Sequence, residues 1–152
     1  KKKITITLYL DINNPENGGG QTSNASPYEE LTGAYFAKGA LPRTFAEIDH
    51  LFLGAIDDSG KPAPLNGFIR PKKSSAKDFE LIDIMIDGKD LSFSTKSVKG
   101  VSYVFNGAFV RMNFGAKIPN SNEVVLKGTL SKLVDGEAAD ETEVSFTFTV
   151  GG

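Results

Sequence analysis

The sequence predicts an all-β fold, an antiparallel meander of about eight to ten short strands that closes into a barrel or half-barrel. Short runs in which apolar and polar residues alternate recur along the chain, and compact turn sequences separate these runs. In addition, glycines interrupt several runs on the side that the alternation assigns to the core. A two-sheet β-sandwich is the alternative arrangement of the same strands.

The N-terminal part of the chain divides into two segments. In residues 1–10 apolar residues alternate with Thr and Tyr, which is typical of a strand and differs from the continuous apolar core of a signal peptide. Residues at about 11–30 are rich in Asn, Gly, Ser and Pro, and we expect a long flexible loop there, within one β domain spanning 1–152. The chain does not begin with Met, which fits a trimmed or processed protein and weakly favours a periplasmic or extracellular location.

The segment 31–56 fits two patterns at once. Phe45, Ile48 and Phe52 lie at helical spacing, whereas residues 50–56 alternate as a strand would. We therefore expect a short helix or a turn around 44–52 that leads into a strand. Residues 79–86 are apolar on both faces, and so we expect the 44–52 segment to cover their outer face.

The later strands are separated by tight turns. Asp-Gly or Lys-Gly pairs stand at 87–88, 99–100 and 135–136, each between two alternating runs. Such pairs favour two-residue hairpins, because glycine readily adopts the positive φ that these turns require. Successive strands are therefore expected to pair antiparallel.

Gly107 and Gly128 share one local pattern, with apolar residues two positions before and after and a basic residue four positions after, and Gly33 and Gly67 repeat it with the basic residue displaced. In a strand these apolar residues lie on the same face as the glycine, so each glycine falls on the buried face. A glycine there marks a bend or a close approach of another backbone, which a small barrel needs more than a flat sandwich does. Chance is the alternative, since the chain has 16 glycines.

Composition excludes several classes of function. There is no cysteine, which excludes disulfides, thiol catalysis and thiolate metal sites. A net charge of −2 offers no broad field for nucleic acid, and no stretch is apolar for long enough to span a bilayer as a helix. With one histidine and no phosphate-binding or nucleophile motif, the sequence predicts no catalytic residue, metal or cofactor, and favours a non-enzymatic role.

The candidate ligand-binding residues are aromatic and basic side chains on or near the strands: Tyr35, His50, Arg70, Tyr103, Phe105, Phe109 and Arg111. The last four of these share one strand face. If this face lines an open barrel, its aromatic rings would hold an apolar body and Arg111 would orient an anionic head group. The alternative is a filled core whose polar tips reach solvent. His50 follows Asp49, but strand neighbours point to opposite faces, so the two should not bond unless the strand bends.

The meander of short strands resembles calycin-like barrels in architecture, although the chain has no tryptophan and therefore lacks the Gly-x-Trp signature of lipocalins. By analogy, this resemblance implies an accessory or secreted barrel that binds a small amphipathic or anionic ligand. Two alternatives remain at this stage. One is a structural or adhesive β-sandwich module with a filled core, and the other is a hydrolase-type enzyme with a site at the barrel mouth.

Overall fold

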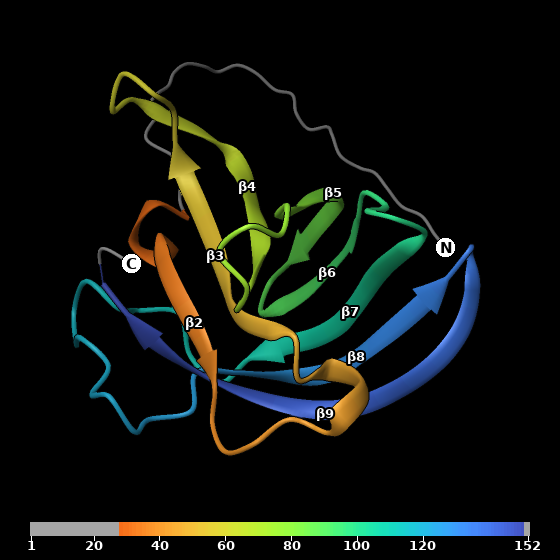
Figure 1. Cartoon of the computed structure of the whole chain (residues 1–152). Coiled ribbons are helices and arrows are strands. Elements are labelled where there is room, and N and C mark those ends of the chain that lie inside the picture. Colours follow the sequence, from red (N-terminus) through yellow and green to blue (C-terminus); the bar gives the residue numbers. More distant parts are fainter. Residues whose placement is uncertain (1–27, 151–152) are drawn as a thin grey trace.

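The computed structural model describes residues 28–150, which form a closed barrel of eight strands (Figure 1). In chain order the elements are η2 (Glu29–Leu31), β2 (Gly33–Ala37), η3 (Arg43–Phe45), β3 (Ile48–Ile56), β4 (Pro62–Pro71), β5 (Phe79–Asp87), β6 (Asp90–Thr95), β7 (Val101–Phe109), β8 (Leu126–Val134) and β9 (Glu137–Thr149). The two η elements are single 3-10 turns. The predicted strand at 1–10 and most of the predicted loop at 11–30 lie outside the described residues.

Every strand pairs antiparallel with the next along the chain, and β9 pairs with β2 to close the ring. The barrel that the glycine pattern favoured over a sandwich is thus confirmed. The seam between β4 and β5 is short, with Phe68 opposite Glu80 and Ile69 opposite Phe79 as its pairs. Beyond this seam the β3–β4 hairpin projects from the body of the barrel (Figure 1).

Two of the predicted hairpin turns have the backbone that their sequences favour. At Lys99 and Gly100 φ is 52° and 82°, and at Asp135 and Gly136 it is 52° and 83°. Two consecutive positive φ values define the type I′ turn, whose twist matches that of the flanking strands. The turn sequences therefore fix where β6 gives way to β7 and where β8 gives way to β9.

The four patterned glycines all lie where another group approaches the position of a Cβ atom to less than 3.0 Å. Gly107 and Gly128 face each other across β7 and β8, and the ring of Phe105 lies over both. Gly33 and Gly67 flank Leu53 from either side, on β2 and β4. The close approach predicted from the sequence is confirmed, and chance is not needed to explain these glycines.

Aromatic rings fill much of the space inside the strands. Phe105 stacks on Phe93 with ring centroids 5.3 Å apart and meets Phe146 edge-on at 6.0 Å. Towards the end where β7 finishes, Tyr35 packs against Phe148 at 5.1 Å. These pairs contribute apolar burial and fixed ring geometry to the core.

One of the local expectations for residues 44–52 was confirmed and one was wrong. The segment is a turn that leads into a strand, with the last residues of η3 followed by the first residues of β3. It does not cover residues 79–86, because a bulge at Asp83, with φ of 52°, reverses the faces of β5 and leaves Met85 46% exposed. Residues 137–143, a polar segment directly after the turn at Asp135 and Gly136, are part of β9 because they pair with β8 outside the core.

Candidate functional site

Loops 38–47, 72–78 and 96–100 lie at the same end of the barrel as the turn 135–136, because successive strands run in opposite directions. Between three of these segments lies a cleft of about 570 Å³, which we call the end cleft. Its lining residues are Glu47, Pro71, Ser75, Ala76, Lys77, Phe79, Ser97, Val98, Lys99 and Val101. This volume falls within the range of small-molecule sites in proteins, roughly 300–1,000 Å³.

The lining combines an apolar surface with two cations. Phe79, Val98 and Val101 supply apolar side chains from the first residues of β5 and β7 and from the loop between β6 and β7. Lys77 and Lys99 are exposed and come from two different loops. Within residues 28–150 neither ammonium group has a hydrogen-bonded or ion-paired partner. The cleft therefore offers an apolar contact surface beside positive charge that no carboxylate of the described chain neutralises.

A polar cluster lies beneath the cleft. The ring of Tyr103 meets that of Phe79 edge-on at 5.1 Å, and its hydroxyl donates a hydrogen bond to Glu47. The same carboxylate oxygen of Glu47 lies 3.4 Å from the ammonium of Lys132. Burial, and then the hydrogen bond and charge of Glu47, raise the pKa of Tyr103. The phenol thus stays neutral and continues to donate to Glu47.

The loop 38–47 is fastened to β8 and β9 beside this cluster. The ammonium of Lys132 donates to the carbonyl of Thr44 at 3.0 Å, and the hydroxyl of Thr44 donates to Asp140. The next residue, Phe45, is fully buried, and its ring centroid lies 6.3 Å from that of Tyr103. The loop therefore closes this end of the barrel under the end cleft.

Arg70 supports the wall of the cleft from outside. Its guanidinium pairs in a bidentate manner with Asp78, at 2.6 Å and 3.1 Å, and lies 4.9 Å from the centre of the Phe68 ring. Asp78 closes the 72–78 loop, which carries Lys77 into the cleft. Arg70 was predicted to bind ligand, and the geometry gives it a contact with the loop that does line the cleft.

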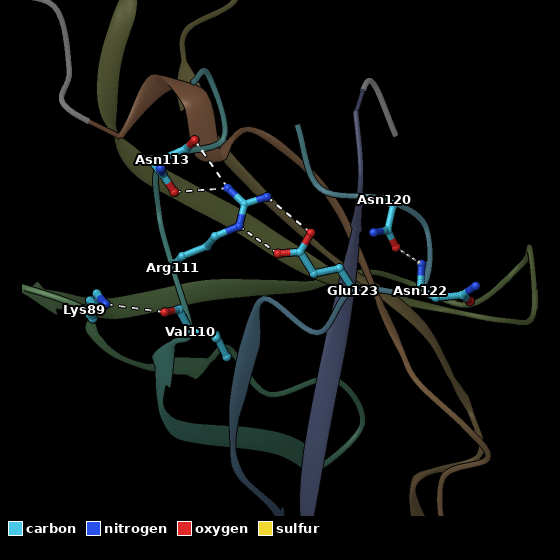
Figure 2. A network of polar contacts seen from close by, with 7 residues as sticks. All are labelled: Lys89, Val110, Arg111, Asn113, Asn120, Asn122 and Glu123. Carbon is cyan, nitrogen blue, oxygen red and sulfur yellow. Dashed lines mark hydrogen bonds and ion pairs between the residues drawn. The ribbon is translucent and has the colours of Figure 1, made fainter. Parts of the chain in front are cut away.

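Arg111 lies at the opposite end of the barrel, in a network of its own (Figure 2). Its guanidinium donates to both carboxylate oxygens of Glu123, at 2.7 Å and 3.2 Å, and to the side chain of Asn113 at 3.0 Å. The hydrogen bonds and charge of Arg111 lower the pKa of Glu123. These contacts fasten the two ends of the long connection between β7 and β8.

The predicted site residues therefore do not form one cluster. Tyr35, Phe105 and Phe109 are buried inside the barrel among other aromatic rings. His50 lies on the outer surface, 5.0 Å from the ring of Phe36. Its Nδ1 contacts Asp49 at 2.7 Å, because the register shifts between Ile48 and His50 and supplies the bend that such a bond requires.

Sequence reasoning missed the residues that line the end cleft. Two smaller clefts also occur, of about 360 Å³ beside the β5–β6 turn and about 320 Å³ beside the loop 38–47, and none of the seven predicted residues lines any of the three. Ser-x-Lys tripeptides occur at 59–61, 75–77, 94–96 and 97–99, and the missed signal was that those at 75–77 and 97–99 lie in connections at the same end of the barrel. All six of these residues line the end cleft.

The described residues contain no group of three or more His, Asp or Glu side chains that could hold a metal ion. No helix within 28–150 is long and apolar enough to cross a membrane. The eight-strand antiparallel barrel fits a calycin-like architecture. Comparison of the chain with known proteins found no matching family model, curated protein or solved structure.

Proposed function

We propose that the protein is a non-enzymatic binding protein that holds a small amphipathic ligand in the end cleft. One observation carries the proposal: an apolar surface at a barrel end lies beside two lysines that have no acidic partner in the described chain. Ligand sites usually combine a concave apolar lining with a few polar groups that fix orientation. The mouth of a β-barrel is a common place for them.

The backbone of Lys99 supports a role beyond folding. Its φ of 52° is one that Asn, Asp and Gly tolerate much better than Lys, and the equivalent position of the other type I′ turn is occupied by Asp135. A residue kept in an unfavourable conformation suggests a function for its side chain. Lys99 brings its ammonium to the end cleft at this cost.

Tyr103 is the predicted residue that this proposal retains. It lies directly beneath the apolar surface and, through Glu47, fixes the floor of the cleft. The predicted role of Arg111 as the anchor of an anionic head group is transferred to Lys77 and Lys99, because the guanidinium of Arg111 already donates to Glu123 and Asn113. The proposal includes an accessory, secreted role, which fractionation of cells that express the tagged protein would test.

Titration with the neutral, environment-sensitive dye Nile red tests the proposal. We expect saturable binding with one dye per chain. Val101→Trp should fill the cleft and weaken dye binding at least about tenfold, a loss of about 1.4 kcal/mol. Val150→Trp is the control, because Val150 is 65% exposed and lies outside the cleft lining. Thermal melts establish that both variants fold.

Two results would count against the proposal. Saturable binding that Val101→Trp leaves unchanged would place the dye elsewhere, and the end cleft would lose its assignment. Absence of saturable binding would favour the structural module, for which the densely packed aromatic interior is the supporting observation.

A further inference from the structure

The basic residues of the chain are unevenly distributed. The loops 72–78 and 96–100 hold five of its 17 lysine and arginine residues and a single acidic residue, Asp78. Asp78 is committed to Arg70, and Lys96 is paired with Glu80 at 3.1 Å. Four lysines in these loops thus lack an acidic partner in the described chain: Lys72, Lys73, Lys77 and Lys99. In a protein of net charge −2, the positive charge of these two loops is a local feature.

The two loops present the same functional groups to the cleft. Ser75 and Lys77 line it from one loop, and Ser97 and Lys99 line it from the other. Each Ser-x-Lys tripeptide therefore supplies one hydroxyl donor and one ammonium donor. An anion that accepts hydrogen bonds through several oxygens can use both pairs at once.

The charges in the cleft add to a dication. Glu47 is its one carboxylate, and the ammonium of Lys132 lies beside it at 3.4 Å. This leaves Lys77 and Lys99 uncompensated. A head group with two negative charges neutralises them, whereas a singly charged head group leaves one cation without a partner.

We infer that the end cleft binds an amphiphile whose head group is a phosphate monoester, gripped by the two Ser-x-Lys tripeptides while its apolar part lies against Phe79, Val98 and Val101. A phosphate monoester carries a charge of about −1.5 to −2 at neutral pH and three acceptor oxygens, which match two ammonium and two hydroxyl donors. This inference rests on the proposed function and adds the head group to it.

Three compounds with one apolar body and different head groups separate the two proposals: 1-naphthyl phosphate, 1-naphthalenesulfonate and 1-naphthol. Their affinities are measured by displacement of Nile red and by calorimetry. Near neutral pH we expect the phosphate to bind at least about fivefold more tightly than the sulfonate, and the sulfonate more tightly than naphthol. Raising the salt concentration should weaken the binding of 1-naphthyl phosphate more than that of the other two compounds, because salt screens exposed charges.

The pH dependence gives a second readout. Between about pH 7.5 and about pH 5 the phosphate gains a proton, since its second pKa is about 6, and its advantage over the sulfonate should disappear. The sulfonate does not titrate in this range. It therefore reports any change in the charged groups around the head group, namely Glu47, Lys77, Lys99, Lys132 behind Glu47, and Asp135, whose carboxylate lies beside Gly100.

Matched variants test the residues. Lys77→Met and Lys99→Met should each weaken the affinity for 1-naphthyl phosphate about three- to fivefold and change the affinity for 1-naphthol less than about twofold. Lys127→Met is the control, because Lys127 is an exposed strand lysine outside the cleft lining and should leave both affinities unchanged. Ser75→Ala and Ser97→Ala should cause smaller losses, again for the phosphate alone.

The outcomes distinguish the two proposals. Two results would overturn the phosphate assignment: equal affinity for the phosphate and the sulfonate near neutral pH, or no loss of phosphate affinity in Lys77→Met and Lys99→Met. The ligand-binding proposal would still stand in either case if naphthol competes with the dye. No binding of any compound would overturn both. Vesicles that contain phosphatidic acid identify the source: cosedimentation indicates a lipid head group, and binding of 1-naphthyl phosphate alone indicates a free monoester, both of which support the assignment.

Discussion

Replacing Gly107 by Ala is expected to destabilise the barrel, because the added methyl group has no room. Its Cβ atom would lie 2.5 Å from Cζ of Phe105 and 2.9 Å from Cα of Gly128, and closer still to the carbonyl oxygen of Lys127. Real Cβ atoms essentially never approach other atoms below 3.0 Å. Since two of these three neighbours are backbone atoms of β8, rotation of a side chain cannot relieve the clash.

The expected loss follows from this geometry. Overpacking a well-packed core costs roughly 1–3 kcal/mol, and here the pairing of β7 with β8 must shift, so the upper part of this range applies, about 2–3 kcal/mol. For a chain of this length 1 kcal/mol corresponds to about 2–4 °C, which predicts a fall in Tm of about 4–12 °C. Urea unfolding monitored by circular dichroism measures the free energy directly.

Two further variants identify the cause. Gly54→Ala is the control, because its Cβ would meet only side-chain atoms, at 3.1 Å from the ring of Phe52 and 3.5 Å from Asn66, and it should change the free energy of unfolding by less than about 0.5 kcal/mol. Adding Phe105→Leu to Gly107→Ala removes the ring clash but not the backbone clash, so it should not restore stability. If Gly107→Ala is as stable as Gly54→Ala, the close approach of β7 and β8 does not constrain residue 107.

Two other predictions concern the ends of the barrel. Arg111→Met should lower Tm near pH 7, and the difference from the parent should vanish towards about pH 3. The reason is that the ion pair lowers the pKa of Glu123. The stabilisation by the ion pair is therefore present above the usual pKa of 4.5 and is lost as the pH falls through the lowered pKa. A difference in Tm that stays constant down to that pH would contradict this. Lys99→Asn should relieve an unfavourable φ, raise the free energy of unfolding by up to about 1 kcal/mol and weaken the binding of 1-naphthyl phosphate. Lys99→Arg keeps both the charge and the strained backbone, so it should change neither quantity. Equal effects of the two variants would refute the idea that stability is exchanged for binding at this residue.

Much of the fold was predictable because its determinants are local. Alternation assigns the faces of a strand, and Lys99-Gly100 and Asp135-Gly136 specify type I′ turns without reference to the rest of the chain. The pairing of Gly107 with Gly128 could not be read from the sequence, but the pattern of apolar and basic residues shared by the four glycines predicted a close approach at each of them. The bulge at Asp83 was not predicted. The sequence pattern of residues 79–86 is the same for a strand that reverses its faces as for a strand that is buried on both sides.

The candidate site was less predictable because its residues come from separate loops. Tyr103 and Arg111 share one strand face in the sequence pattern, whereas in the structure Tyr103 belongs to one end of the barrel and Arg111 to the other. Their distance in sequence implies a separation on the order of 20 Å along the strand direction. The two Ser-x-Lys tripeptides, by contrast, are 22 residues apart and meet because the connections before β5 and before β7 emerge at the same end of the barrel.

The two ends of the barrel differ in a way that favours ligand binding at only one of them. At the end where β7 finishes, the connection to β8 returns across the core, buries Phe114 against Phe148 at 4.7 Å, and is fastened by the pair of Arg111 and Glu123. The charges of Arg111 and Glu123 are matched there within the protein. At the other end each connection is shorter than the one between β7 and β8, the apolar surface remains open as a cleft, and Lys77 and Lys99 form no ion pair within the described chain. Exposed charge beside apolar surface stabilises the folded chain little by itself, and a bound anion would use both.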